Sequence, residues 1–360
     1  MLFITLIIFS PSISHAASFS YAVWIPYWRD DPGTAEVAPN LKAIQEISPF
    51  SYEVRADGTL ADKLKIGLDP WPGFFAAAAG NKSMILPTVS WIDGDAILRT
   101  LASTTARTRH IAEIVDTVRT NNFAGIDIDY ENKKAETRAY FSKFLKELSA
   151  KLRKDKKILS CSIESRTPVN SRFVVVPKDL KYANDFSAIG QYCDEVRILA
   201  YDQNNIDLKL NKQKGRSEPY APVADIDWVK KVLQEALKSV SAKKIMLGIP
   251  TFGYEHAITP RLNGEWDYQK IRSVSYQKAM KLAQSASATP LRNRAGEMSF
   301  TYHVISSSTP LTASSTCLVW FPDAVSAQAK IKLAKQFKLR GIAVFKADGE
   351  SDPTMWQVLK

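Results

Sequence analysis

The sequence predicts a closed barrel of eight parallel strands with a helix after most of them. Two observations support this fold class. Eight apolar runs rich in β-branched residues recur along the 360-residue chain, and amphipathic helical patterns separate most of them. Strands that alternate with helices form right-handed β-α-β units with parallel strands, and eight such units favour a closed (β/α)₈ barrel over an open sheet.

The expected strands are short and apolar. They are Tyr21–Trp28, Ile47–Glu53, Met84–Trp91, Phe123–Glu131, Ile158–Glu164, Val196–Asp202, Ile245–Phe252 and Ile342–Phe345. The expected helices carry apolar residues three and four positions apart, which is the spacing of one helix face. They cover Thr108–Asn121, Glu136–Leu152, Ile226–Val240 and Ala324–Phe337.

One long segment interrupts this alternation. About 70 residues separate the seventh strand from the helix that begins at Ala324, too many for a plain loop. The segment contains a helical pattern, Tyr276–Gln284, and two β-like runs, Ser299–Val304 and Cys317–Phe321. We expect a small α+β insertion, about residues 254–320, on the C-terminal rim of the barrel, where it deepens the groove.

The N-terminus is typical of a signal peptide. An apolar block, Met1–Phe9, is followed by Ser14-His15-Ala16, a small-x-small cleavage pattern. We therefore predict a signal peptide over residues 1–16, a catalytic domain over 17–360, and a secreted or cell-envelope location. A buried first strand or a misplaced start codon is the alternative. No later run approaches the roughly 20 apolar residues of a membrane span, so we expect no integral membrane segment after signal removal. We also expect a monomer.

The chain is basic, with 48 Lys and Arg against 37 Asp and Glu, and a formal net charge of +11. The lysines are scattered, and no Arg-rich stripe with interleaved aromatic residues is present, so nucleic acid is not an expected partner. A solvated basic surface explains the excess charge. Attraction to an anionic cell wall or envelope is the functional alternative.

The cysteines and histidines do not form a metal or nucleophile motif. Cys161, Cys193 and Cys317 lack CxxC spacing, which leaves one disulfide of undetermined pairing or three buried thiols. The four histidines are dispersed along the chain, at His15, His110, His256 and His303. We expect no metal site, no cofactor and no Ser-His-Asp triad.

Three carboxylates alternate with apolar side chains in the run Phe123–Glu131, which reads FAGIDIDYE. Side chains on a strand alternate between faces, so Asp127, Asp129 and Glu131 share one face, with neighbours roughly 6–7 Å apart. Burying a carboxylate is costly unless it is paired or neutralised. Catalysis is the commonest reason for a protein to bear this cost.

The depth of each acid follows from the barrel. Active sites of such barrels lie at the C-terminal ends of the strands, so Glu131 projects highest, and Asp129 and Asp127 lie below it. Mutual repulsion favours a shared proton and raises the pKa of Glu131 toward that of a general acid at neutral pH.

Other side chains at strand ends are typical of a sugar site. Glu164 closes the fifth strand, and Tyr201 with Asp202 closes the sixth. Aromatic residues stand at further strand ends, although core packing is an alternative role for them: Trp24, Tyr27, Trp28, Tyr52, Trp91 and Phe345.

These residues resemble glycoside hydrolase family 18, whose signature is D-G-x-D-x-D-x-E on the fourth barrel strand. Residues 124–131 here read AGIDIDYE. The resemblance covers nearly all of the mature chain, and further matches are Leu199–Asp202, Leu247–Pro250, Gly253-Tyr254 and Trp320–Ala324. Residues 47–53 with Asp57-Gly58 look closest to the bacterial branch that includes spore cortex-lytic, peptidoglycan-directed enzymes.

The resemblance implies retaining, substrate-assisted hydrolysis of β-1,4 bonds next to N-acetylglucosamine in peptidoglycan or chitin. It implies Glu131 as the general acid/base, Asp129 as the residue that orients the acetamido group, and Asp127 as its proton-sharing neighbour. Tyr201 would hydrogen-bond the acetamido oxygen. The expected substrate-binding residues are Asp202, Trp24, Tyr52, Trp91, Tyr254 and Phe345.

Two positions depart from the family pattern. Ala124 replaces the first Asp of the signature, which we expect to alter pKa values rather than abolish activity. Phe345 stands where the family usually has a Trp, so it offers less area for stacking. The alternative function is a non-catalytic, lectin-like family 18 protein. Such members usually lack the acid Glu, so the presence of Glu131 argues against it.

Overall fold

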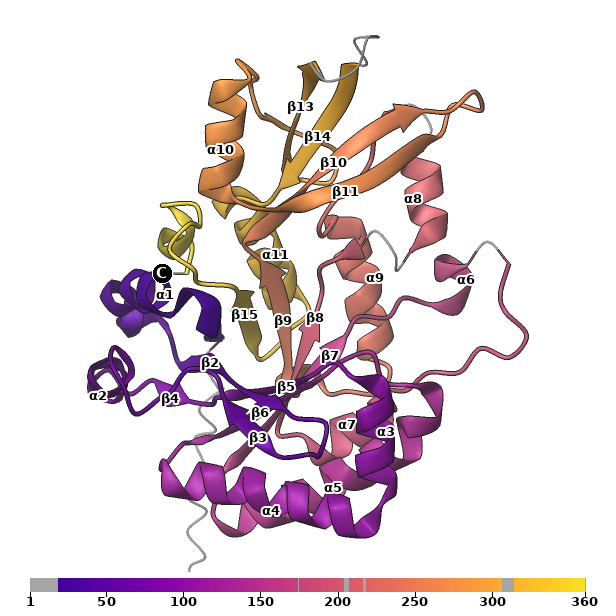
Figure 1. Ribbon diagram of the computed structural model, residues 1–360. Coiled ribbons are helices and arrows are strands. Elements are labelled where there is room, and N and C mark those ends of the chain that lie inside the picture. The colour runs from indigo at the N-terminus through magenta and orange to yellow at the C-terminus, as the bar shows by residue number, and fades with distance from the viewer. Residues whose placement is uncertain (1–18, 174, 204–206, 216–217, 306–313, 360) are drawn as a thin grey trace, which may run out of the picture.

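The computed structural model describes residues 19–173, 175–203, 207–215, 218–305 and 314–359. Within these residues, eight parallel strands close into a barrel in which β1 pairs with both β2 and β15 (Figure 1). The predicted (β/α)₈ barrel is confirmed. The barrel strands are β1 (Ser20–Pro26), β2 (Glu46–Val54), β5 (Thr88–Trp91), β6 (Gly125–Tyr130), β7 (Ile158–Glu164), β8 (Glu195–Leu199), β9 (Ile245–Pro250) and β15 (Gly341–Phe345).

Two small strands extend the barrel wall. β3 (Leu60–Asp62) pairs antiparallel with β2, and β4 (Met84–Ile85) pairs parallel with it. The sequence predicts one strand over Met84–Trp91, but the structure divides it into β4 and β5. The break falls at Leu86-Pro87, and Pro87 has no N–H to donate to a strand ladder.

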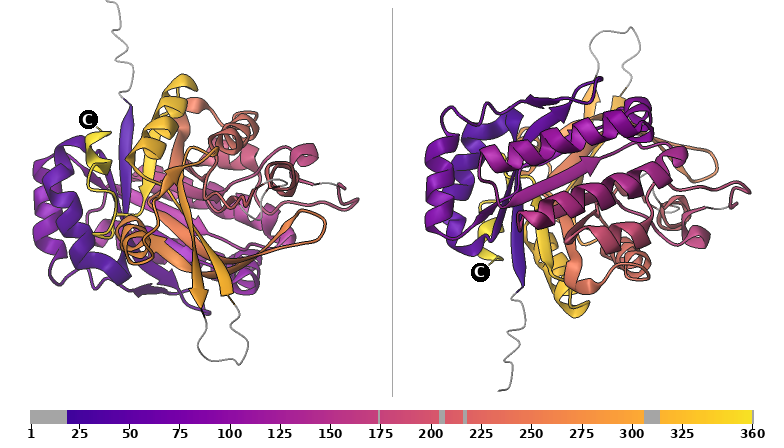
Figure 2. Two further views of the ribbon diagram at one scale, coloured as in Figure 1. Left: turned by 90° about the horizontal axis from the view of Figure 1, so that it is seen from above. Right: turned by 90° about the horizontal axis from the view of Figure 1, so that it is seen from below.

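Apart from α10 (Tyr276–Ser285) of the insertion, the described α-helices lie around the barrel wall and its rim (Figure 1). They are α1 (Asp30–Val37), α2 (Trp71–Gly80), α3 (Gly94–Ala102), α4 (Thr104–Thr120), α5 (Arg138–Lys154), α6 (Val169–Arg172), α7 (Phe186–Tyr192), α8 (Leu208–Lys214), α9 (Ile226–Ala236) and α11 (Ala324–Gln336). The long helices α4 and α5 run alongside each other across the barrel (Figure 2). On α5, Phe141, Phe144, Leu145, Leu148 and Leu152 are buried, as their spacing predicts.

The insertion forms a second, smaller sheet above the barrel. Its described part has five antiparallel strands in the order β11-β10-β14-β13-β12. Its elements are β10 (Phe252–Pro260), β11 (Trp266–Ser275), α10 (Tyr276–Ser285), β12 (Leu291–Arg292), β13 (Met298–Ile305) and β14 (Ser314–Phe321). The helix and two strands occur where the sequence predicts them. The hairpin of β10 and β11 is not predicted, because most of β11 is exposed and lacks an apolar pattern.

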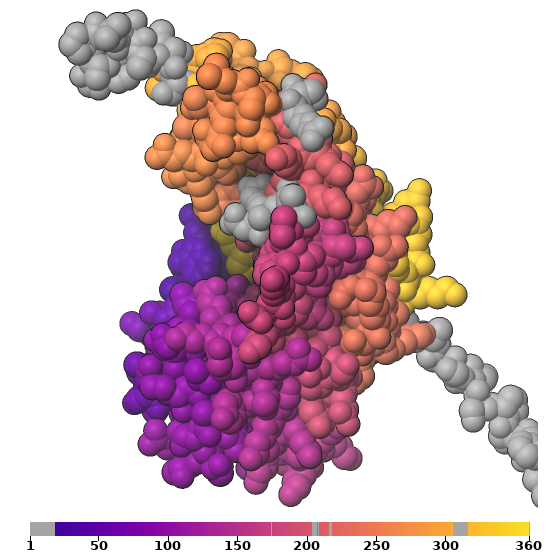
Figure 3. All heavy atoms as spheres, turned by 90° about the vertical axis from the view of Figure 1, so that its right-hand side faces the viewer, coloured from indigo at the N-terminus to yellow at the C-terminus, as the bar shows by residue number. Residues whose placement is uncertain are grey.

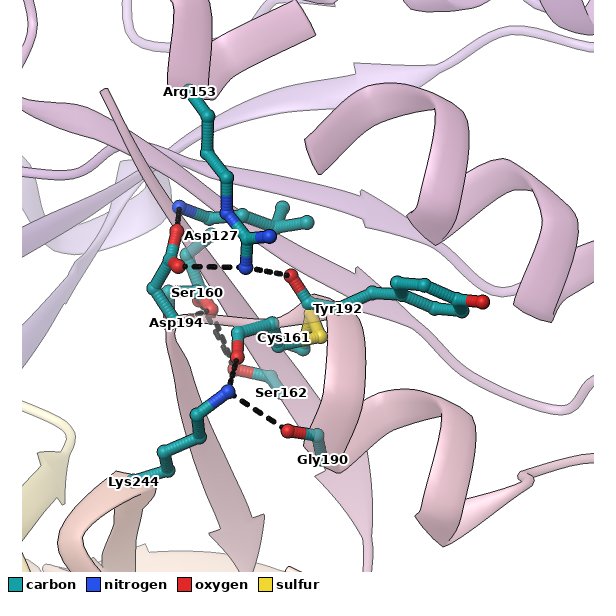
Figure 4. The surroundings of a disulfide bond; sticks show 11 residues. Asp127, Arg153, Ser160, Cys161, Ser162, Gly190, Tyr192, Asp194 and Lys244 are labelled. Carbon is teal, nitrogen blue, oxygen red and sulfur yellow. Dashed lines mark hydrogen bonds and ion pairs between the residues drawn. A yellow bond between two sulfur atoms is a disulfide. The ribbon is translucent and has the colours of Figure 1, made fainter. Parts of the chain in front are cut away.

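A disulfide joins Cys161 in β7 to Cys193, which follows α7, with a Cα–Cα distance of 6.1 Å. Cys317 is a buried free thiol. The structure thus chooses between the cysteine states that the sequence left open. Figure 4 shows that Cys161 lies between Ser160 and Ser162.

The predicted signal peptide, residues 1–16, lies outside the described residues. None of the helices in the described part of the chain is long and apolar enough to cross a bilayer.

Candidate active site

The alternation predicted for β6 is present in the structure. Ile126, Ile128 and Tyr130 are buried in the hydrophobic cluster between the barrel and its helices. Asp127 contacts side chains from other strands inside the barrel, and Asp129 has 5% of its surface exposed. Glu131 follows β6 directly and is the least buried of the three acids.

Asp127 is fully buried and accepts hydrogen bonds from three other strands. The Trp24 indole N–H and the Thr88 hydroxyl donate to Oδ2, at 3.1 and 3.0 Å. The Ser160 hydroxyl donates to Oδ1 at 2.8 Å, and the Ser162 hydroxyl lies 3.0 Å from both oxygens (Figure 4). These donors hold the carboxylate in one orientation and compensate its burial.

A buried arginine lies close to this carboxylate. Arg197 Nη1 is 3.7 Å from Asp127 Oδ2, and the same guanidinium pairs with Glu46 at 3.1 Å and Glu195 at 2.9 Å. Burial alone would lower the pKa of Arg197, but the surrounding carboxylates raise it above its ordinary value. Asp127 therefore faces a permanent positive charge at the centre of the barrel.

Asp129 has a different environment. Its Oδ1 is buried without a hydrogen-bond partner in the described part of the chain. Burial, and then the charges of Glu131 and Asp127, hold the pKa of Asp129 well above its usual range. An unpaired buried oxygen is costly, so this atom is suited to bind a polar group of a ligand.

Glu131 has the pKa of a general acid for neutral pH. Burial raises its pKa to about 7, the charge of Glu164 acts in the same direction, and Lys133 opposes both. A carboxyl group with this pKa is partly protonated near pH 7, so it can donate a proton and later accept one. The predicted elevation of the Glu131 pKa thus has burial as its main cause.

Only one partner of the ion pair beside Glu131 was predicted from the sequence. The Lys133 ammonium lies 3.2 Å from Glu164 Oε2 and also donates to the Tyr130 carbonyl oxygen. Glu164 further accepts a hydrogen bond from the Asn184 amide at 2.6 Å. The sequence indicated Glu164 as a strand-end acid, but Lys133 was not predicted. The position of Lys133, two residues after Glu131, is the sequence feature that could have indicated it.

The rim of the site brings together Tyr201, Asp202 and Tyr254. Burial raises the pKa of Tyr201 well above its ordinary value, so its hydroxyl remains a neutral donor. The Tyr254 hydroxyl donates to Asp202, which is exposed and has a φ of 58°. Asp tolerates this left-handed conformation better than most residues. The Lys270 ammonium lies 3.9 Å from the centre of the Tyr254 ring.

Aromatic rings form the floor beside these residues. Phe345 stacks on Tyr201 with ring centres 5.6 Å apart, and contacts Trp24 at 5.8 Å and Phe252 at 5.9 Å. Trp24 itself is 1% exposed. It contributes by holding Asp127 and supporting Phe345, and it has no free face on which a sugar could stack.

Tyr52 and Trp91 differ from expectation, because both belong to the cluster between the barrel and its helices. Trp91 packs against Tyr130, with ring centres 5.4 Å apart. In β2 the register shifts by one residue between Phe50 and Tyr52. Such a bulge reverses the alternation of side chains, so Tyr52 turns outward. Neither ring lies with the acids.

The groove lies between the barrel and the insertion (Figure 3). A hollow of about 790 Å³ is lined by Asp202, Tyr254 and Lys270, together with Trp266 and Tyr268 of the β10–β11 hairpin. A second hollow, of about 430 Å³, shares Asp202 and Tyr254 and extends past Trp28 and Phe345. The insertion thus supplies one wall of a groove on both sides of Asp202.

Ala124 lies just before β6 and is half-buried. Backbone hydrogen bonds on both sides keep it in the sheet. Its N–H donates to the Ile85 carbonyl oxygen, and its own carbonyl oxygen accepts from the Ile158 N–H. Alternation then places its Cβ on the same face as Ile126, opposite to Asp127. An Asp at this position would not extend the stack of acids inside the barrel.

The comparisons with known proteins agree with this geometry. The family model described as Glycosyl hydrolases family 18 matches residues 79–350. The chain belongs to glycosyl hydrolase family 18. This family 18 protein is 27% identical to the uncharacterized glycosylase YvbX of Bacillus subtilis, over 74% of this chain and 70% of YvbX. It is 24% identical to the cortical fragment-lytic enzyme of Bacillus subtilis, over 91% of this chain and 72% of that enzyme.

Solved structures of family 18 proteins share the fold. The spore cortex-lytic enzyme SleL of Bacillus megaterium superposes with a TM-score of 0.72 at 23% identity, covering 95% of this chain and 73% of SleL. A chitinase from Chromobacterium violaceum gives 0.73 at 22% identity, covering 95% of this chain and 98% of the chitinase. At these identities the likeness concerns the fold.

Proposed function

We propose that this family 18 protein hydrolyses β-1,4 glycosidic bonds next to N-acetylglucosamine, with retention of configuration and with the substrate's own acetamido group as nucleophile. One observation carries the proposal. Asp129 Oδ1, which is buried and has no hydrogen-bond partner among the described residues, lies on the same strand face as Glu131, whose pKa is about 7. The site thus offers an acid and, beside it, an oxygen in need of a polar partner.

In the proposed reaction Glu131 donates its proton to the glycosidic oxygen as the bond to the anomeric carbon breaks. The acetamido oxygen attacks that carbon and forms an oxazolinium ion. Asp129 accepts a hydrogen bond from the acetamido N–H, which orients the acetamido group and stabilises the positive charge that develops on it. The Tyr201 hydroxyl donates to the acetamido oxygen. Glu131 then removes a proton from the water that opens the ring, which restores the original configuration.

Peptidoglycan and chitin both supply the required 2-acetamido group, and cellulose does not. Relatives named as cortical fragment-lytic enzymes and similar structures named as chitinases support both substrates. Export is part of the proposal. The apolar leader of the sequence supports it, and so does the disulfide between Cys161 and Cys193, because disulfides persist in oxidising compartments outside the cytosol.

The test is to incubate the purified protein separately with chitooligosaccharides and with purified peptidoglycan, and to identify products by mass spectrometry. We expect cleavage that leaves N-acetylglucosamine at the new reducing end. Glu131→Gln should reduce turnover by about 10²–10⁴-fold and retain binding. Glu136→Gln, at an exposed position five residues further on, is the matched control and should keep full activity.

The alternative function makes the opposite prediction. A non-catalytic, glycan-binding protein would show saturable binding of either polymer without any cleavage product. That outcome, obtained with a folded wild-type protein, would overturn the proposal.

A further inference from the structure

The end of the barrel opposite the groove carries a ring of lysines. Here we call it the N-terminal face, defined as the turns that lead from helices into barrel strands. Six of its lysines are exposed, and within the described residues none of them is in ion-pair contact with a carboxylate: Lys42, Lys82, Lys154, Lys156, Lys243 and Lys338.

Three carboxylates on this face form ion pairs with cations other than the six lysines. Asp155 pairs with an arginine at 2.7 Å, and Asp194 pairs with another at 3.1 Å. Glu235 forms an ion pair with a lysine at 2.5 Å. The respective partners are Arg119, Arg153 and Lys238. Within the described residues, the six lysines therefore remain outside these ion pairs.

The helix dipole explains only part of this arrangement. A cation in the last turn of a helix is stabilised by the negative end of the dipole, and Lys154 ends α5. Lys156, Lys243 and Lys338 lie beyond the last residue of the preceding long helix. They come from turns spaced around the barrel, so they form a ring across one face and do not line a groove.

The chain enters the barrel at this same face. The Ser20 N–H donates to the Arg340 carbonyl oxygen at 2.9 Å, which anchors the start of β1 beside the turn before β15. The apolar block Met1–Phe9 of the sequence precedes this point. A leader that is still attached in a membrane would therefore hold the N-terminal face next to the bilayer, and the groove away from it.

We infer that the N-terminal face is a docking surface for a bilayer that contains anionic phospholipids. Charge complementarity and the entry point of the chain both favour a lipid surface as the partner. Each lysine near an anionic bilayer contributes about fivefold to binding at moderate ionic strength. Docking in this orientation would direct the groove toward material outside the membrane. The inference is independent of the proposed catalytic function.

The test is co-sedimentation of residues 19–360, whose barrel is closed from β1 onward, with phosphatidylcholine vesicles that do or do not contain phosphatidylglycerol. We expect binding only with phosphatidylglycerol, and loss of binding in high salt. A quadruple variant should weaken binding by at least about tenfold. Its substitutions are Lys154→Glu, Lys156→Glu, Lys243→Glu and Lys338→Glu.

A second quadruple variant is the matched control. It makes the same charge change at exposed lysines away from this face: Lys178→Glu, Lys181→Glu, Lys230→Glu and Lys281→Glu. It should bind within about twofold of the wild type if the location of the charge matters. Thermal unfolding of both variants checks that they fold. Equal losses in the two variants would overturn the inference, and so would salt-sensitive binding to soluble polyphosphate without binding to vesicles.

Discussion

The Lys133 ammonium, which is inaccessible to solvent, lies 3.2 Å from the Glu164 carboxylate. The two partners have opposite effects on the nearby acid, since the charge of Glu164 raises the pKa of Glu131 and that of Lys133 lowers it. This ion pair thus sets part of the pH range in which Glu131 can act.

The first prediction follows from this opposition. A general acid must be protonated, so activity falls as pH rises through its pKa. Lys133→Met should raise the Glu131 pKa and move the alkaline limb of the kcat/KM profile to higher pH. Glu164→Gln should move the same limb to lower pH. Lys134→Met, an exposed neighbour that pairs with Asp95, is the control and should leave the limb in place.

The measurement is the pH dependence of kcat/KM with a chromogenic N-acetylglucosaminide. Shifts of the alkaline limb in the same direction for both variants would show that the ion pair acts through structure and not through charge.

The disulfide gives a second prediction. It closes a loop with a sequence separation of 32 residues. Restricting an unfolded chain in this way stabilises the folded state by about 3–4 kcal/mol. The double variant Cys161→Ala, Cys193→Ala should lose about this much free energy of unfolding in a urea titration. A reductant should destabilise the wild type and leave the variant unchanged. A variant as stable as the wild type would contradict the prediction.

His110 gives a third prediction, on stability against pH. Its Nδ1 lies 2.6 Å from the Gly58 carbonyl oxygen, its Nε2 contacts the Tyr130 hydroxyl, and burial lowers its pKa to about 4. The unfolded chain binds a proton below its pKa of about 6.5 and the folded chain does not. The contribution of His110 to the free energy of unfolding is therefore undiminished above pH 6.5, and it declines as pH falls toward 4. At pH 5 it should be about 2 kcal/mol smaller than at pH 7.

Urea unfolding at the two pH values measures this difference. Burial also lowers the pKa of His256 to about 4, so it contributes a similar loss. Relative to the wild type, His110→Gln should lose about 2 kcal/mol less free energy of unfolding between pH 7 and pH 5, because the acids with raised pKa values, such as Glu131, are the same in both proteins. The control His303→Gln, at an exposed position, should retain the wild-type dependence. Equal slopes in wild type and His110→Gln would exclude this role for His110.

Ala124 gives the fourth prediction. From the sequence we expected this position to alter the pKa values of the acids. Alternation in the structure places its Cβ on the face opposite to Asp127. We therefore expect Ala124→Asp to leave the pH–rate profile unchanged. A shifted profile would show that a carboxylate on the outer face still reaches the acids electrostatically. Thermal unfolding of the variant would separate such a shift from a loss of stability.

Periodicity made much of the fold predictable. A period of two placed the three acids of β6 on one face, and a period of 3.6 located α4, α5, α9 and α11 to within a few residues. These patterns are local, because each arises from burial of one face of a single element. The β10–β11 hairpin lacked such a pattern, since β11 packs few apolar side chains.

The sequence by itself determined which acids point inward and the order of their depth. Only the tertiary structure decided what surrounds each of them. Asp127 is held by Trp24 and Ser160, which are 103 and 33 positions away in the chain, and such contacts depend on how the barrel closes. The bulge that turns Tyr52 outward likewise depends on the pairing of β2 with β5. Pairing between strands is non-local, so no local pattern in the sequence encodes it.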